Sequence, residues 1–409
     1  MTEGDASPLR LFQGHGVELE YMLVRIDDLA VVPISDRVLQ SPAGEITNEV
    51  EVEEVSWSNE LVLHVMELKN TVPAPALGPL GDLFSEHVKR MNATVEPMGA
   101  MLMPGAMHPL MRPRDETRIW PHEGREIYEA FHRVFDCRRH GWANLQSAQL
   151  NLSFGDDEEF GRLHAAIRLV LPVVAALAAS SPIVEGELTG IADSRLEVYR
   201  TNGGRVPATT GEIIPEPIFG RAEYEKLVYE PMYREIEAHD PEGTLRHPWL
   251  NARGAIPKFG LGAIEVRILD VQECPQADIA IASAVTAVLK ALVGEVFCDY
   301  GRQRAWETAP LAEIFLATLR SAEKTVIRNH AYLKALAFPD RDGTARDLWL
   351  YLVEALGLDS PHLRVILDHG PLSRRIVNAL GSNPRREDVV TVYRALCESL
   401  ASGRSFAGL

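Results

Sequence analysis

One stretch near the N-terminus, residues 14–25, limits the fold more than any other part of the chain. Its residues alternate with a period of two, the pattern of a β-strand that is covered on one face. The apolar Val17, Leu19 and Tyr21 alternate with Glu18 and Glu20. Side chains two residues apart point to the same face of a strand, so Glu18 and Glu20 stand side by side. The stretch therefore predicts a covered strand that carries a pair of carboxylates.

Two interpretations of this carboxylate pair remain open. Carboxylates this close repel one another and resist burial unless a cation or a shared proton joins them. In a cleft over the sheet, Glu18 and Glu20 would hold a divalent cation, for which we take Mg²⁺. On an open sheet face, the commoner place for glutamate in strands, the pair would be solvated.

Further acidic residues occur at strand ends and in one acidic stretch. Residues 61–69 read as a central strand with Glu67 and Lys69 on one face, and residues 263–270 as a strand with Glu265 and Arg267 on one face. In each pair the two charges can neutralise each other. Alternatively, the glutamate of a pair can bind a cation, and Arg267 can bind a phosphate beside the cation on Glu265. Residues 38–68 contain seven glutamates and no lysine or arginine. Such a run is usually a solvated face but can also supply metal ligands.

Three other segments point to a binding site. Residues 146–154 alternate regularly and place neutral polar side chains, including Gln149 and Asn151, on one face. A solvated face more often carries charges, so this row favours a pocket wall. Residues 103–126 form a long basic loop, which fits an anionic substrate or ordinary surface salt bridges. Residues 201–220 are rich in glycine and proline and long enough to act as a lid.

The composition excludes several classes of function. A net charge of −17 argues against a nucleic-acid partner, since phosphate binding needs clustered lysine and arginine. The longest apolar run, residues 169–179, contains Pro172 and is too short to span a membrane. Four cysteines without a CxxC pair indicate reduced thiols in a cytoplasm. Neither GxxxxGK nor GxGxxG occurs, so an ATP site here would not use a P-loop.

The order of the patterns predicts an α+β fold. Strands and loops fill most of the first two-thirds of the chain, and the pattern is helical from about Ala277 onward. We divide the chain into an α+β region with the sheet at residues 1–300 and a helical region at residues 301–409, packed on the same domain.

Several short segments follow one another in the order of a known family. They are Gly16-Val-Glu-Leu-Glu20, Glu67-Leu-Lys69, Leu171-Pro172 through Ala178-Ala-Ser-Ser-Pro182, Thr189-Gly190, Ser194-Arg195 and Glu265-Val-Arg267-Ile-Leu-Asp270. In these segments the sequence resembles the type 2 bacterial glutamate–cysteine ligases and their carboxylate–amine ligase relatives, in the glutamine synthetase superfamily. The resemblance implies a mainly antiparallel sheet curved into a funnel and covered by helices, with ATP and Mg²⁺ on its concave face.

The resemblance also implies roles for individual residues. The metal ligands would be Glu18, Glu20, Glu67 and Glu265. Arg267 would contact the transferred phosphoryl group, and Arg195 a substrate carboxylate or the nucleotide. His108 falls in the family's substrate loop and would bind the substrate. Apart from the resemblance, Asn151 of the polar row and Arg114 and Arg118 of the basic loop are further substrate-binding candidates. Many members carry a metal-binding histidine where this chain has Gln149, whose amide oxygen still ligates a hard cation, though more weakly than a charged ligand.

These features together predict an ATP- and Mg²⁺-dependent ligase that joins the carboxylate of a glutamate-like amino acid to an amine, cysteine-like or other, through an acyl phosphate. Phosphoryl transfer needs positioning and charge neutralisation more than a protein nucleophile. Two alternatives stay open: a non-catalytic nucleotide- or metabolite-binding protein of the same fold, and a phosphotransferase that stops at the phosphorylated acid. We expect amino-acid substrates and neither a nucleic acid nor a membrane as partner, and a homo-oligomer is compatible with the sequence.

Overall fold

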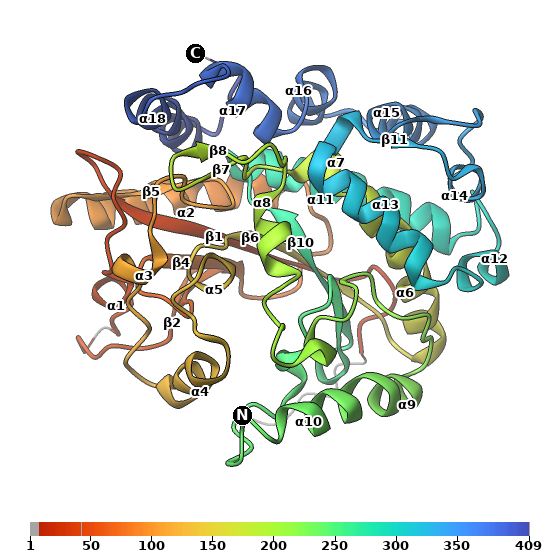
Figure 1. The fold of residues 1–409 in the computed structure, drawn as a ribbon, viewed down its shortest axis with the longest axis horizontal. Coiled ribbons are helices and arrows are strands. Elements are labelled where there is room, and N and C mark those ends of the chain that lie inside the picture. Colours follow the sequence, from red (N-terminus) through yellow and green to blue (C-terminus); the bar gives the residue numbers. More distant parts are fainter. Residues whose placement is uncertain (1–7, 42, 409) are drawn as a thin grey trace.

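The centre of the structure, a computed structural model that describes residues 8–41 and 43–408, is an eight-stranded antiparallel sheet. The strand order is β2-β3-β4-β1-β6-β10-β9, and β5 pairs with the second half of β1 (Figure 1). The strands are β1 (His15–Arg25), β2 (Glu49–Val52), β3 (Val55–Asn59), β4 (Val65–Asn70), β5 (Ala100–Met103), β6 (Ser147–Ser153), β9 (Ala255–Lys258) and β10 (Ala263–Asp270). Smaller pairs are β7 (Ile183–Val184) with β8 (Glu187–Leu188) and β11 (Val326–Ile327) with β12 (Gly343–Thr344).

β1 is the strand that organises the sheet. It lies between β4 and β6 over its first half, so both of its edges are paired. Val17, Leu19 and Tyr21 are buried in the main hydrophobic core, while Glu18 and Glu20 occupy the opposite face. Full burial of each apolar side chain contributes about 1.5–3 kcal/mol to stability. The covered strand predicted from the alternation is confirmed.

Long helices cover the apolar face of the sheet. α11 (Pro275–Val293) packs against both α2 (Leu80–Val95) and α6 (Asp157–Val170), which in turn contact strands of the sheet. The Asp156 side chain caps α6 by accepting a hydrogen bond from the Glu159 N–H (3.0 Å). α11 meets the length and composition of a membrane span, but 72% of its apolar window is buried inside the protein. It is the central core helix.

The rest of the chain adds helices around this centre. In the first two-thirds they are α1 (Ser35–Val38), α3 (Pro113–Glu116), α4 (Arg125–Phe135), α5 (His140–Ala143), α7 (Ala175–Ala178), α8 (Ser194–Tyr199), α9 (Arg221–Tyr224) and α10 (Glu230–Ile236). In the last third they are α12 (Tyr300–Arg304), α13 (Thr308–Ser321), α14 (His330–Ala335), α15 (Ala345–Ala355), α16 (Pro361–His369), α17 (Leu372–Leu380) and α18 (Arg386–Ser402).

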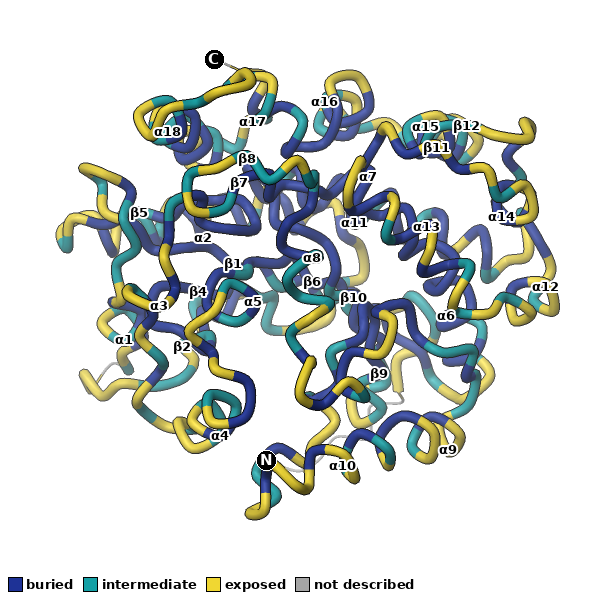
Figure 2. The backbone as a smooth tube through the Cα atoms, viewed as in Figure 1, coloured by how far each residue is buried: buried dark blue, intermediate teal, exposed yellow. Residues whose placement is uncertain are grey.

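The C-terminal helices share the core of the sheet region. The main hydrophobic cluster includes residues from Val17 to Leu400, and Figure 2 shows buried segments both in the sheet and in the helices around it. The indole N–H of Trp349 on α15 donates to the Val173 carbonyl (2.8 Å). The predicted α+β class is confirmed, and the division at residue 300 stays a prediction.

One local expectation was wrong. β4 begins at Val65 and not at residue 61, because the chain turns before it and Val62 forms only an isolated bridge with Ile119. In the 201–220 loop, Ile213 and Ile214 are buried in the main core, and its role as a lid stays a prediction.

Candidate active site

One face of the sheet gathers polar side chains from four strands. Directly opposite one another in the register are Glu20 and Glu67, Glu18 and Gln149, and Glu265 and Asn151. Neighbouring strands lie about 4.8 Å apart, so these side chains are within reach of one another. The carboxylates predicted from separate segments therefore lie in one place.

Three carboxylates form the tightest group on this face. One ligand oxygen from each of Glu20, Glu60 and Glu67 lies within 4.8 Å of the others. Glu20 also accepts hydrogen bonds from the Ser147 N–H (2.7 Å) and the Gln149 amide (2.9 Å). Burial, followed by the charges of Glu20 and Glu67, raises the pKa of Glu60, and burial raises the pKa of Glu20. Like charges this close ionise together only around a cation, so the group can hold a divalent metal.

A second group pairs two carboxylates with two positively charged side chains. Lys258 on β9 forms an ion pair with Glu265 and lies 3.6 Å from Glu18 Oε1. Arg267 Nε donates to Glu265 Oε1 (3.0 Å). Burial alone would raise the pKa of Glu265, but Arg267 and Lys258 outweigh it and lower that pKa. Glu265 is therefore an ionised carboxylate whose charge the protein already neutralises.

An irregularity in β10 determines the direction of the Arg267 side chain. The register between β10 and β6 shifts between Val266 and Leu269. The Arg267 N–H donates to the Gly254 carbonyl (3.0 Å), and its Nη1 donates to the Asn251 carbonyl (3.2 Å). A bulge of this kind re-aims a side chain next to a site, and these bonds hold the guanidinium in place.

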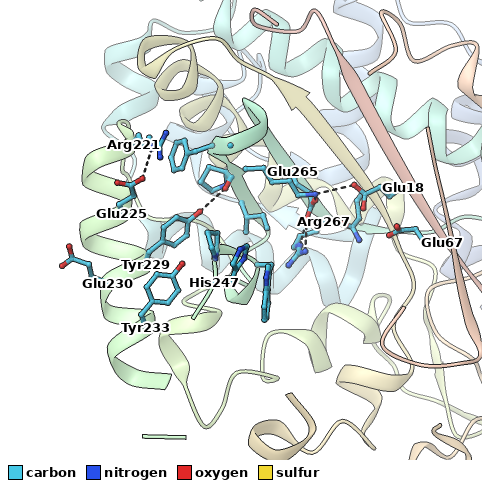
Figure 3. A pocket seen from close by; sticks show the side chains of 18 of the residues that line it. Glu18, Glu67, Arg221, Glu225, Tyr229, Glu230, Tyr233, His247, Glu265 and Arg267 are labelled. Carbon is cyan, nitrogen blue, oxygen red and sulfur yellow. Dashed lines mark hydrogen bonds and ion pairs between the residues drawn. The ribbon is translucent and has the colours of Figure 1, made fainter. Parts of the chain in front are cut away.

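Two adjoining cavities open on this face, and we call them the larger and the smaller chamber. The larger chamber measures about 750 Å³ and is lined by aromatic rings and by charged side chains. Tyr229 belongs to a single helical turn, η4 (Glu225–Tyr229), and its ring stacks with that of Tyr233 at 6.0 Å between centroids. Figure 3 shows these rings and His247 on one side, with Glu18, Glu67, Glu265 and Arg267 on the other. The chamber offers stacking surfaces to one part of a ligand and charges to another.

The smaller chamber, about 290 Å³, combines a buried arginine with an aromatic wall. Arg195 on α8 is 2% exposed and forms an ion pair through Nε with Asp270. Its Nη2 has no hydrogen-bond partner among the described residues. The wall rings are Phe131, Phe135 and Trp142. An unpartnered guanidinium N–H in a buried chamber is suited to a carboxylate ligand.

The chambers share the residues at their junction, which are Glu60, Gln149, Trp249 and Arg267. The Gln149 amide nitrogen donates one hydrogen bond to Glu20, which leaves the amide oxygen to bind a cation. Glu60, Gln149 and Arg267 each line both chambers. A ligand group at the junction can thus contact one carboxylate, one amide and one guanidinium.

Most of the predicted site residues line these chambers. The larger one contains Glu18, Glu67, Gln149, Glu265 and Arg267, and the smaller one contains Glu20, Gln149, Arg195 and Arg267. Asn151 lies next to them and donates to Glu18 Oε1 (2.9 Å). The individual roles of these residues stay predictions.

Three predicted substrate-binding residues lie elsewhere. His108 is buried, with Nε2 2.6 Å from the Leu29 carbonyl oxygen and Nδ1 accepting from the Leu110 N–H (3.1 Å), so backbone groups occupy both ring nitrogens. Arg118 is exposed and bonds to two backbone carbonyls of its own loop. We therefore no longer expect either to bind a substrate in the chambers. Arg114 lines a separate hollow, described below.

Some site residues carry little or no sequence signal. Glu60 was one of seven glutamates in residues 38–68, and that acidic stretch was its only signal. Lys258 and the rings of Tyr229 and Tyr233 belong to no motif that we recognised. Lys258 reaches the site through the pairing of β9 with β10, and the two tyrosines reach it through the positions of η4 and α10.

The stability of the cation-free protein should fall as the pH rises. Burial, followed by Glu67 and Glu265, raises the pKa of Glu18 from 4.5 to about 8. The folded protein thus holds this proton more tightly than the unfolded chain, and the stability it provides below pH 4.5 is lost as the pH passes about 8. We expect the Tm to fall between about pH 5 and pH 8.5, and Mg²⁺ to raise it more at the higher pH. Equal Mg²⁺ shifts at both pH values would contradict this prediction.

Comparison with known proteins agrees with the geometry. The chain matches the model of glutamate–cysteine ligase family 2 (GCS2) over residues 15–336. An uncharacterized protein of Archaeoglobus fulgidus is 36% identical over 268 residues, covering 66% of this chain and 72% of that protein. A "Putative glutamate–cysteine ligase" of Rubrobacter xylanophilus is 26% identical over 287 residues, covering 69% of this chain and 67% of its own.

Two solved structures share the fold. The glutamate–cysteine ligase of Francisella tularensis in complex with AMP has a TM-score of 0.57 at 13% identity, covering 95% of this chain and 89% of its own. A bifunctional glutathione synthetase from Pasteurella multocida also has a TM-score of 0.57, at 14% identity, covering 95% of this chain and 52% of its own. The resemblance first seen in the short segments is confirmed. The chain belongs to glutamate–cysteine ligase family 2.

Proposed function

We propose that this protein is an ATP- and Mg²⁺-dependent ligase that activates the carboxylate of a glutamate-like amino acid as an acyl phosphate and joins it to an amine. Membership of the family and the shared fold support a carboxylate–amine ligase in general. The observation that carries the proposal is the junction, where Glu60, Gln149 and Arg267 line the larger and the smaller chamber at once.

The larger chamber suits ATP. Its volume of about 750 Å³ is that of a small-molecule site, and aromatic faces at one end suit a nucleobase. The phosphates would then extend toward Arg267 and toward Lys258, which contacts Glu18 and Glu265. The AMP in the Francisella tularensis enzyme supports a nucleotide in a protein of this fold.

Three carboxylates at and beside the junction fit Mg²⁺. Glu20, Glu60 and Glu67 supply hard oxygen ligands close enough to share one cation, and burial raises the pKa of Glu20 and of Glu60, so both are costly to ionise without it. We expect these three to hold the ion, with Glu18 and the Gln149 amide oxygen beside them. Bound there, Mg²⁺ supplies charge neutralisation on phosphate oxygens.

The chain's own residues position two steps. First, an oxygen of the acid's carboxylate attacks the γ-phosphorus of ATP, the bond to ADP breaks, and an acyl phosphate forms. Arg267 stabilises the charge on the transferred group, and Arg195 Nη2 orients a second carboxylate of the acid. Then the amine nitrogen attacks the acyl carbon, inorganic phosphate leaves, and the nitrogen loses a proton. Neither step needs a protein nucleophile.

An assay of ADP release with pairs of amino acids and amines tests the proposal. We expect ADP only when acid, amine and Mg²⁺ are all present, together with an amide of matching mass. No substrate-dependent ADP from any pair, despite ATP binding in calorimetry, would support the non-catalytic alternative. ADP with a phosphorylated acid and no amide would support the phosphotransferase.

We also propose a cytoplasmic location. All four cysteines are buried free thiols. Burial raises the pKa of Cys397 to about 12, which keeps it in the unreactive thiol form. Free thiols of this kind are typical of a reducing compartment.

A further inference from the structure

A third cavity lies beside the smaller chamber, and we call it the arginine hollow. It measures about 580 Å³, and residues at α3, at α5 and at the end of α8 line it. Its walls carry four arginines, which are Arg112, Arg114, Arg138 and Arg139. They come from the basic loop and from the connection between α4 and α5, and all four are exposed.

The positive charge of this hollow is largely unbalanced. Two carboxylates line it, Asp115 and Glu185, and Glu185 already interacts with His140 (3.2 Å). Within residues 8–41 and 43–408, no ion pair or side-chain hydrogen bond involves any of the four guanidinium groups. Their arrangement is unusual in a chain with a net charge of −17. An unpaired arginine cluster in a concave surface attracts and holds anions, because the guanidinium fork matches a carboxylate or a phosphate.

The arginine hollow and the smaller chamber share a wall. Gly141 and Asn202 line both cavities. The Asn202 amide donates to the Gly141 carbonyl, and a side chain at position 141 would collide with Asn202. The two cavities therefore meet at Gly141 and Asn202, which separate the arginine hollow from the chamber that Arg195 lines.

We propose that the arginine hollow binds a further anionic group of the substrate, so that the acid used by this protein carries additional carboxylates or phosphates beyond its reacting end, as an acidic peptide does. The proposal rests on the proposed function for placing the reacting end in the smaller chamber. It gives a function to Arg112 and Arg114 of the basic loop (residues 103–126), which line the arginine hollow and not the chambers.

Calorimetric titration tests the proposal without any turnover, so its result is separate from that of the ADP assay. The probe is triglutamate, and triglutamine is the neutral peptide of equal length. We expect triglutamate to bind more tightly than triglutamine, with an affinity that falls as salt rises. The double variant Arg114→Gln/Arg138→Gln should bind it about tenfold more weakly, since two charge-assisted contacts are lost. Titration with tripolyphosphate then shows which anion the hollow prefers, carboxylate or phosphate.

The matched control is Arg328→Gln, which removes one exposed arginine that lines none of these cavities. We expect its affinity for triglutamate to equal that of the unaltered protein. Thermal unfolding of the double variant should be unchanged because both residues are exposed. Equal affinities for triglutamate and triglutamine, no binding of triglutamate, or equal losses in the double variant and the control would each overturn the proposal.

Discussion

Replacing Glu60 by glutamine is expected to lower the rate of ADP formation about 100-fold and to raise the Mg²⁺ concentration needed for activity. Glu60 supplies one of three ligand oxygens within 4.8 Å of one another, and a neutral amide binds a hard cation more weakly than a carboxylate. The amide oxygen can keep the hydrogen bond that Glu60 Oε2 accepts from the Leu61 N–H (3.3 Å). The measurement is the initial rate of ADP release as a function of Mg²⁺.

The stability of this variant separates a metal role from a structural one. Glu20 and Glu67 raise the pKa of Glu60, so removing its charge relieves repulsion. Without Mg²⁺, the free energy of unfolding should stay the same or rise. Glu51→Gln is the control, because Glu51 is an exposed glutamate of β2. A Glu60→Gln protein that is destabilised and keeps its normal Mg²⁺ requirement would contradict the assigned role.

Replacing Arg267 by glutamine is expected to reduce the rate by about 100-fold or more, because a positioned guanidinium stabilises the charge on the transferred phosphoryl group. Arg267 lines both chambers, so it is the cation placed to act on a group that passes between them. Arg267→Lys keeps the charge but loses the fork, and should retain part of the rate. Single-turnover measurement of ADP formation distinguishes the two variants.

The Arg267→Gln substitution should also change the pKa of Glu265, which can be measured. The charge of Arg267, together with Lys258, lowers the pKa of Glu265, so that pKa should rise in Arg267→Gln. Lys258 still pairs with Glu265, which keeps the fold intact. Arg302→Gln, at an exposed site on α12, is the control for loss of one positive charge. A full rate in Arg267→Gln would remove Arg267 from the mechanism.

The strands and their polar face could be predicted because the period of two is a local property. Glu18 and Glu20 on β1, and Gln149 and Asn151 on β6, follow from alternation alone. Which strands are neighbours depends on pairing between distant segments, so the contact between Glu20 and Glu67 needed the register. The resemblance to the family supplied that link before the register was known.

Other parts of the site depend on tertiary structure with no local pattern. Glu60 follows β3 at a turn, where no periodicity marks its direction. The direction of the Arg267 side chain depends on a bulge in β10 that the sequence does not reveal. Histidine is a common binding residue, yet packing places the His108 ring against the backbone carbonyl of Leu29, which is far away in the chain. Local charge likewise did not reveal that the basic loop lines a hollow of its own.

The central claim is that carboxylates from separate parts of the sheet region hold a divalent cation between the two chambers. The most direct measurement is an anomalous difference map from crystals grown with Mn²⁺, in place of Mg²⁺, and a non-hydrolysable ATP analogue. The account predicts a peak about 2.1 Å from carboxylate oxygens of Glu20, Glu60 and Glu67, with phosphate oxygens on its other side. A map with no peak on this face of the sheet, or with the metal and the nucleotide bound elsewhere, would contradict it.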